Sequence, residues 1–139
     1  HRNKDWGLKN WQKLSDILQE EHLVIQSVHN EGIELNNIFT CQVDFRIACA
    51  LINKSNIFIG PEGGLGHASA ALAKPAVIIF GGWIHPSITG YDFHENIYID
   101  IKGSPCGAVG YECKHCKECM KKITLDQVIF SINKILKNK

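Results

Sequence analysis

The chain has 139 residues, of which 45% are hydrophobic and 21% are charged, and its formal net charge is +1. This composition is typical of a globular domain and argues against disorder, while the small net charge argues against a nucleic-acid partner held by bulk positive charge. No apolar run approaches the roughly 20 residues that a membrane-spanning helix needs, and the polar N-terminus has no signal-peptide apolar segment.

A chain of this length is expected to form one domain, here residues 1–139. Its first segment, HRNKDWGLKN, has no initiator Met and already contains a motif that is described below. We therefore expect the chain to be an excised part of a longer protein.

The first half of the chain alternates between helical and strand patterns. Trp11, Leu14 and Ile17 recur at helical spacing, and Asp44 is placed to cap a second helix. The predicted elements, in chain order, are an amphipathic helix over 9–21, a short strand over 22–28, a polar loop over 30–37, a helix over 44–53 and a strand over 56–60.

The second half continues the alternation with a predicted helix over 64–73. The apolar run at 76–82 is typical of a strand covered on both faces, and an alternating strand is expected over 96–101. Thr124 is placed to cap a last amphipathic helix. This order predicts an α/β fold, with a parallel sheet, helices on both faces and right-handed crossovers.

The strongest functional signal is GPEGGLGHASAALAKPAVIIFGG, at 60–82. A strand is expected to end at Gly60 and a helix to begin near Gly64, so backbone N–H groups and the positive end of a helix dipole point to one place. Such a place binds phosphate, and the glycines of the turn let a ligand approach closely. His67, within the first helical turn, can donate a hydrogen bond to a phosphate oxygen.

The alternative interpretation is a tight strand-to-helix turn in which glycine serves packing alone. The segment is neither G-x-G-x-x-G nor a P-loop, because the P-loop Lys-Ser/Thr pair is missing. These departures argue against a dinucleotide oxidoreductase and against an NTPase.

Two motifs together resemble the heptosyltransferases of glycosyltransferase family 9. One is EGGLGH at 62–67, followed by an Ala-rich helix, KP and a strand ending in FGG; the other is Lys4-Asp5-Trp6, which is similar to the family's Lys-x-Trp segment. The resemblance covers essentially the whole chain. It implies the Rossmann-like C-terminal half of a glycosyltransferase B-type fold, with the N-terminal acceptor domain absent from this chain.

The resemblance implies a binding site for a nucleoside diphosphate sugar, similar to ADP-heptose. Lys4 would contact the diphosphate or the sugar, and Glu62, where the family usually has Asp, would contact sugar hydroxyls. Backbone N–H groups of the turn would bind the diphosphate. The candidate donor-binding residues are Lys4, Glu62, Gly63, Gly64, Leu65 and His67.

Simpler interpretations stand beside these roles. Lys4 can be a solvated surface lysine, and Glu62 can bond only the amides of its own turn. The family's ribose-binding acidic residue has no secure match, and Glu31 and Glu34 are the candidates.

The polar loop HPSITGYDFH, at 85–94, follows the FGG strand end and is expected at the same edge of the sheet. Ser87 and Thr89 are weaker donor-site candidates, since their hydroxyls can bond phosphate oxygens. An ordinary loop is the alternative for each.

An insertion at about 103–122 is predicted before the last helix, and it contains four of the six cysteines. They follow the pattern C-x6-C-x2-C-x2-C: Cys106, Cys113, Cys116 and Cys119. Two-residue gaps allow thiolates to converge on one metal, and four cysteines suit a closed tetrahedral Zn²⁺ site with a structural role. An iron–sulfur cluster, disulfides and reduced thiols are the alternatives, and His94 and His115 are further possible ligands.

The hypothesis from the sequence is a donor-binding domain of a glycosyltransferase that moves a sugar such as heptose to a lipopolysaccharide-type glycolipid. No catalytic residue is assigned to this chain, since the general base is expected on the missing half, and the chain alone is expected to be inactive. The alternatives are a non-enzymatic zinc-stabilised binding module and half of a sugar-nucleotide epimerase.

No cofactor is expected for the chemistry itself, and no nucleic-acid partner. The glycolipid acceptor would bind through the missing domain. We expect a cytoplasmic protein that can lie peripherally at the inner face of the membrane.

Overall fold

The computed structural model describes residues 4–29, 32–107 and 116–137. The helices are α1 (Leu8–Leu18), α2 (Phe45–Lys54), α3 (Gly64–Ala71), α4 (Pro86–Thr89), α5 (Cys116–Lys122) and α6 (Leu125–Lys137). The strands are β1 (Ile25–Val28), β2 (Phe39–Gln42), β3 (Phe58–Pro61), β4 (Ala76–Gly81) and β5 (Glu95–Tyr98).

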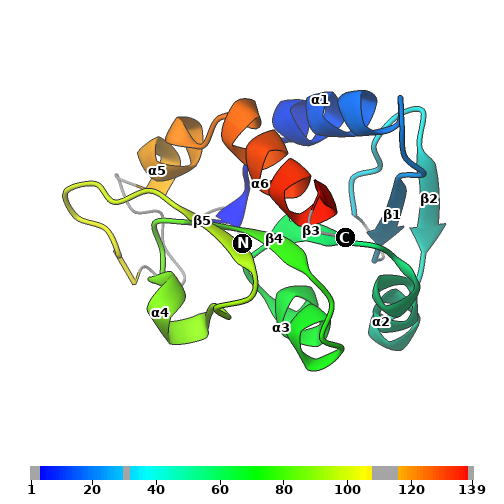
Figure 1. Cartoon of the computed structure of the whole chain (residues 1–139). Coiled ribbons are helices and arrows are strands. Elements are labelled where there is room, and N and C mark those ends of the chain that lie inside the picture. Colours follow the sequence, from blue (N-terminus) through cyan, green and yellow to red (C-terminus); the bar gives the residue numbers. More distant parts are fainter. Residues whose placement is uncertain (1–3, 30–31, 108–115, 138–139) are drawn as a thin grey trace.

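The described strands pair in parallel, as predicted, but they form two hydrogen-bonded sheets. One sheet is β1–β2, and the other has the order β3–β4–β5, in which Ile59 lies opposite Val77 and Val77 opposite Glu95. Helices α1, α5 and α6 lie on one side of the larger sheet, while α3 and α4 lie on the other (Figure 1). This Rossmann-like arrangement confirms the predicted α/β class.

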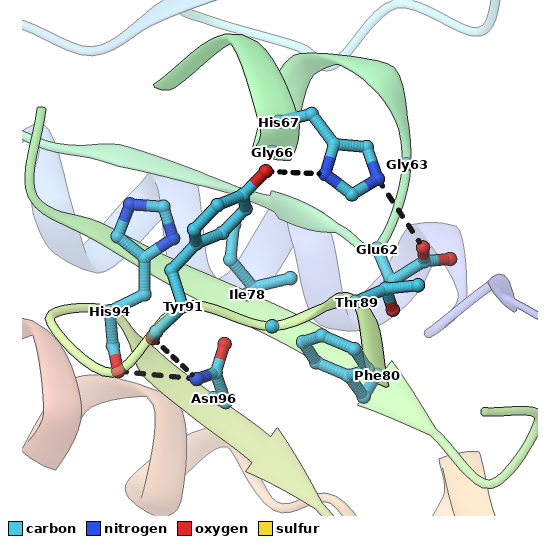
Figure 2. A pocket seen from close by; sticks show the side chains of 11 residues that line it. Glu62, Gly63, Gly66, His67, Ile78, Phe80, Thr89, Tyr91, His94 and Asn96 are labelled. Carbon is cyan, nitrogen blue, oxygen red and sulfur yellow. Dashed lines mark hydrogen bonds and ion pairs between the residues drawn. The ribbon is translucent and has the colours of Figure 1, made fainter. Parts of the chain in front are cut away.

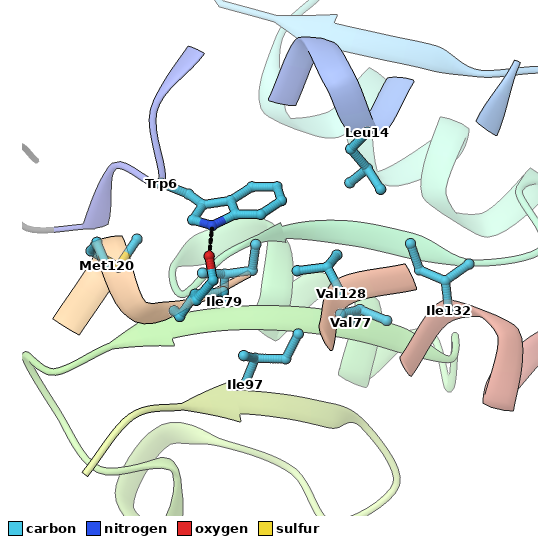
Figure 3. Packing of buried hydrophobic residues seen from close by; sticks show 9 residues of the cluster. Trp6, Leu14, Val77, Ile79, Ile97, Met120, Val128 and Ile132 are labelled. Carbon is cyan, nitrogen blue, oxygen red and sulfur yellow. Dashed lines mark hydrogen bonds between the residues drawn. The ribbon is translucent and has the colours of Figure 1, made fainter. Parts of the chain in front are cut away.

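β4 is buried along its whole length, which agrees with its continuous apolar sequence. Because successive side chains alternate between faces, Val77 and Ile79 join one core and Ile78 and Phe80 another. The larger core, on the α1–α5–α6 side, is shown in Figure 3. Its buried members are Trp6, Leu14, Val77, Ile79, Ile97, Met120, Ile123, Val128 and Ile132.

Two predicted helix caps are confirmed. The carboxylate of Asp44 accepts a hydrogen bond from the Ile47 backbone N–H at 2.9 Å. Thr124 Oγ1 accepts from the Gln127 N–H while Gln127 Oε1 accepts from the Thr124 N–H, which is a reciprocal capping box.

Three short elements were not predicted, namely β2, α4 and α5. β2 has only four residues and partly polar sequence, and its pairing with β1 comes through parallel partners rather than a local hairpin. α4 begins at Pro86 inside the segment that we expected to be a loop. α5 lies in the cysteine-rich insertion, where the regular spacing of the cysteines obscures helical periodicity.

Candidate functional site

The β3–α3 turn is built as the sequence predicts. β3 ends at Pro61, and Gly63 stands at the N-cap of α3 with φ 156° and ψ −165°, a conformation that strongly favours glycine. Gly63 has no side chain to cap the helix, so the first backbone N–H groups of α3, from Gly64 and Leu65, are available to an anion. The turn lies at the carboxyl end of β3, beside β4, where open parallel sheets bind ligands.

Lys4 and Glu62, which are 58 positions apart, meet at this turn. Lys4 Nζ donates to Glu62 Oε2 in an ion pair, and the Glu62 residue is only 7% exposed. Lys4 Nζ also lies 4.1 Å from the ring centroid of Trp83, in the segment after β4. Two predicted donor-binding residues are therefore brought together, and Trp83 lies beside them although the sequence analysis did not single it out.

His67 completes the group from the first turns of α3 (Figure 2). Its Nε2 lies 4.0 Å from Glu62 Oε1, and its Nδ1 lies 3.0 Å from the hydroxyl of Tyr91. The His67 side chain is 46% exposed, so it borders solvent rather than the core. Tyr91 was not predicted, because nothing in its sequence neighbourhood separates it from an ordinary loop tyrosine.

A pocket extends from Glu62 along the face of β4 beneath α3. Within the described part of the chain, the buried side-chain atoms without a hydrogen-bond partner are Thr89 Oγ1, His94 Nδ1 and Asn96 Oδ1, and all three residues line this pocket. Burial lowers the pKa of His94, opposed in part by its hydrogen bond to the Lys74 carbonyl. Because that carbonyl accepts from Nε2, the neutral ring presents a bare Nδ1.

The two hydroxyl candidates on α4 differ in environment. Ser87 is exposed, and its Oγ lies 2.8 Å from His85 Nδ1. Thr89 lines the pocket with Glu62 and His67. Thr89 is therefore near the predicted donor residues, whereas Ser87 contacts His85, two residues before it.

Two of the four clustered cysteines lie against Gly82, the residue that follows β4. The Cys106 N–H donates to the Gly82 carbonyl at 2.9 Å, and a Cβ built on Gly82 would touch Cys119 Sγ, which is buried. Cys113 and the side chain of Cys116 lie outside the described residues. No group of three metal-ligating side chains occurs among the residues that the structure describes.

Four candidates remain, namely His94, Glu34, Glu31 and His115. His94 is buried against the Lys74 carbonyl, before the first residue of β4, whereas Cys106 and Cys119 lie at the opposite end of that strand. This placement argues against His94 as a ligand beside the cysteines. Glu34 is exposed, while Glu31 and His115 lie outside the described residues.

Of the helices within the described residues, none combines the length and the apolarity needed to cross a membrane.

The sequence matches the family model of glycosyltransferase family 9 (heptosyltransferase) over residues 1–114. The fold is similar to the crystal structure of TibC from enterotoxigenic E. coli H10407, described as a bacterial iron-containing dodecameric glycosyltransferase. The identity is 18% and the TM-score 0.72, and the match covers 97% of this chain and 43% of TibC. The chain thus spans less than half the length of TibC. No curated protein matches the sequence.

Proposed function

The chain belongs to glycosyltransferase family 9, and on that premise we propose that it forms the half of a sugar-transferring enzyme that binds the nucleoside diphosphate sugar. The observation that carries the proposal is the meeting of Lys4, Glu62 and the N-terminus of α3 at the carboxyl end of β3. A cation, uncapped backbone N–H groups and a buried carboxylate are the groups that a diphosphate joined to a sugar requires.

The diphosphate would lie against the N–H groups of Gly63, Gly64 and Leu65. Lys4 would offset the negative charge that builds up on the diphosphate as the sugar leaves, and the dipole of α3 adds to this stabilisation. Glu62 would accept hydrogen bonds from sugar hydroxyls. In the reaction, an acceptor hydroxyl oxygen bonds to the anomeric carbon, the carbon–oxygen bond to the diphosphate breaks, and a base on the rest of the enzyme takes the proton.

The family also suggests the transferred sugar, the nucleotide and the acceptor. We propose a heptose or a related sugar as the transferred group, ADP as the first nucleotide to test, and a lipopolysaccharide-type glycolipid as the acceptor. The chain would then be the C-terminal half of a glycosyltransferase B-type fold in a cytoplasmic enzyme that works at the inner face of the membrane. Without the acceptor half, residues 1–139 are expected to bind donor weakly and to transfer no sugar.

The experiment is a calorimetric titration of the chain with ADP and with UDP, followed by amide chemical shifts. We expect shifts centred on residues 63–67 and around Lys4. Lys4→Met should weaken ADP binding by about 10-fold or more, because a charge-assisted hydrogen bond contributes about 1.5–3 kcal/mol. Lys9→Met, on the exposed surface of α1, is the matched control and should leave the affinity unchanged.

The opposite result has a defined meaning. If neither nucleotide causes shifts at millimolar concentration, the donor-site proposal is wrong. A zinc-stabilised binding module then becomes the better interpretation of the cysteine cluster.

We also propose that Cys106, Cys113, Cys116 and Cys119 hold one structural metal ion. The described part fits this assignment, since Cys106 and Cys119 both contact the Gly82 segment. Zn²⁺ suits four thiolates, and iron is the other choice because the fold is similar to that of TibC, which is described as iron-containing. A four-thiolate site leaves no position for substrate, so the metal would brace the fold.

Elemental analysis of protein purified without added metal tests this assignment. We expect about one metal ion per chain, in line with a single four-ligand site. Cys119→Ser should lose the metal, whereas Cys49→Ser, on α2, should keep it. Equal metal content in the wild type and in Cys119→Ser would contradict the proposal.

A further inference from the structure

Tyr91 links the loop between α4 and β5 to the predicted donor turn. Its hydroxyl lies 3.0 Å from Nδ1 of His67, and the two rings meet edge to face at an interplanar angle of 76°. Figure 2 shows the hydroxyl directed at one side of the imidazole, while the other nitrogen faces Glu62. His67 is therefore held between a phenol and a carboxylate.

The chemistry of the two partners favours one tautomer of the ring. A neutral imidazole has one N–H donor and one bare nitrogen acceptor. A tyrosine hydroxyl can donate to the bare nitrogen, whereas a carboxylate can only accept. The arrangement that satisfies both neighbours has the Tyr91 hydroxyl donating to Nδ1 and the proton on Nε2, which points toward Glu62 and the start of α3.

The backbone holds Tyr91 in place for this contact. The Tyr91 carbonyl accepts hydrogen bonds from the His94 N–H at 3.0 Å and from Asn96 Nδ2 at 2.9 Å. The Tyr91 ring also packs edge to face against His94, with ring centroids 5.5 Å apart. A side chain fixed through its own carbonyl and its ring loses little entropy when it orients a neighbour.

We propose that Tyr91 is a positioning residue that holds His67 as the Nε2–H tautomer and directs this N–H to the donor's diphosphate. The assignment rests on the proposed function, because the Nε2–H group needs an anionic ligand at the N-terminus of α3. Through His67, the loop after α4 would contribute to donor binding although Tyr91 itself contacts no phosphate.

The test uses Tyr91→Phe, which removes only the hydroxyl. The matched control is Tyr98→Phe, which removes a hydroxyl that lies 3.0 Å from Ser104 Oγ and not near His67. Nitrogen-15 spectra of the histidine rings are recorded without ligand at about pH 8, where an ordinary imidazole is neutral. These spectra distinguish the two tautomers directly. If Tyr91 had a merely structural role, the tautomer of His67 would be the same in Tyr91→Phe as in the wild type.

In the wild type we expect His67 to carry its proton on Nε2, and in Tyr91→Phe we expect a mixture of the two tautomers. The dissociation constant for ADP should rise about 3-fold to 10-fold in Tyr91→Phe, the range for one lost hydrogen bond. Tyr98→Phe should change neither measurement.

The outcomes separate the two proposals. A proton on Nδ1 in the wild type, or an unchanged ADP affinity in Tyr91→Phe, overturns the role of Tyr91 and leaves the donor site standing. Failure of the wild type to bind ADP or UDP overturns the donor site and, with it, the positioning role.

Discussion

The β3–α3 turn and the cysteine-rich insertion are the two regions with the clearest chemical signals, and they are built in different ways. The turn is a run of neighbouring residues whose backbone supplies the N–H groups, and Gly63 has the conformation that the motif requires. The contacts of the insertion join distant segments of the chain. The Cys106 N–H donates a hydrogen bond to the Gly82 carbonyl, and Cys119 lies beside the same glycine. The turn depends on local geometry, whereas the described part of the insertion depends on how residues 104–107 and α5 pack against the end of β4.

The two regions also touch a common segment, which follows β4. Gly82 lies against Cys119 of the insertion, and the ring of Trp83 lies against Lys4 Nζ of the candidate donor site. In addition, the Gly107 N–H donates to the Trp83 carbonyl at 3.0 Å. The insertion is therefore expected to support the donor site through this segment.

The largest expected effect comes from Gly82→Ala, at the boundary of the two regions. The added Cβ would lie 2.6 Å from Ser104 Oγ and closer still to Cys119 Sγ, so the insertion must shift. We expect a loss of about 2–3 kcal/mol in the free energy of unfolding, measured in urea, as for an overpacked site. Unchanged stability would contradict the tight docking of the insertion.

Trp6→Phe should have the next largest effect. The indole of Trp6 donates to the Ile123 carbonyl at 2.9 Å and so ties the segment bearing Lys4 to the end of the insertion (Figure 3). Loss of this buried hydrogen bond should lower the free energy of unfolding by about 1–2 kcal/mol. Trp11→Phe is the control, since Trp11 is only partly buried, and ADP affinity should fall in Trp6→Phe alone.

Gly64→Ala should separate binding from folding at the turn. A Cβ at this position would meet only Phe45, at an ordinary 3.6 Å, so thermal stability should stay close to that of the wild type. The methyl group would nonetheless stand at the N-terminus of α3, and ADP affinity should fall about 10-fold, or about 1.4 kcal/mol. Unchanged ADP affinity would place the diphosphate elsewhere.

The smallest expected effect is the dependence of stability on pH through His94. Because burial lowers the pKa of His94 below its ordinary 6.5, the unfolded chain binds this proton more readily than the folded chain. Stability from this group is therefore complete above about pH 6.5 and falls as the pH drops below it. His94→Gln should flatten the decline in melting temperature between about pH 7.5 and pH 5.5, whereas His22→Gln, at an exposed position, should not.

The sequence determined the features that depend on neighbouring residues. Apolar periodicity was sufficient to predict four helices and four strands of the α/β frame in order, and short-range hydrogen bonding was sufficient to predict the caps at Asp44 and Thr124. The glycine pattern predicted the β3–α3 turn for the same reason, since the required backbone conformation is local.

Tertiary structure alone decided which distant side chains meet. The sequence suggested Lys4 and Glu62 only through a family resemblance, and it gave no reason to place Trp83 over Lys4 or Tyr91 against His67. Nor did it predict β2, whose four residues are stabilised by parallel pairing with β1. These contacts depend on how strands and helices pack across long sequence separations, which no local pattern encodes.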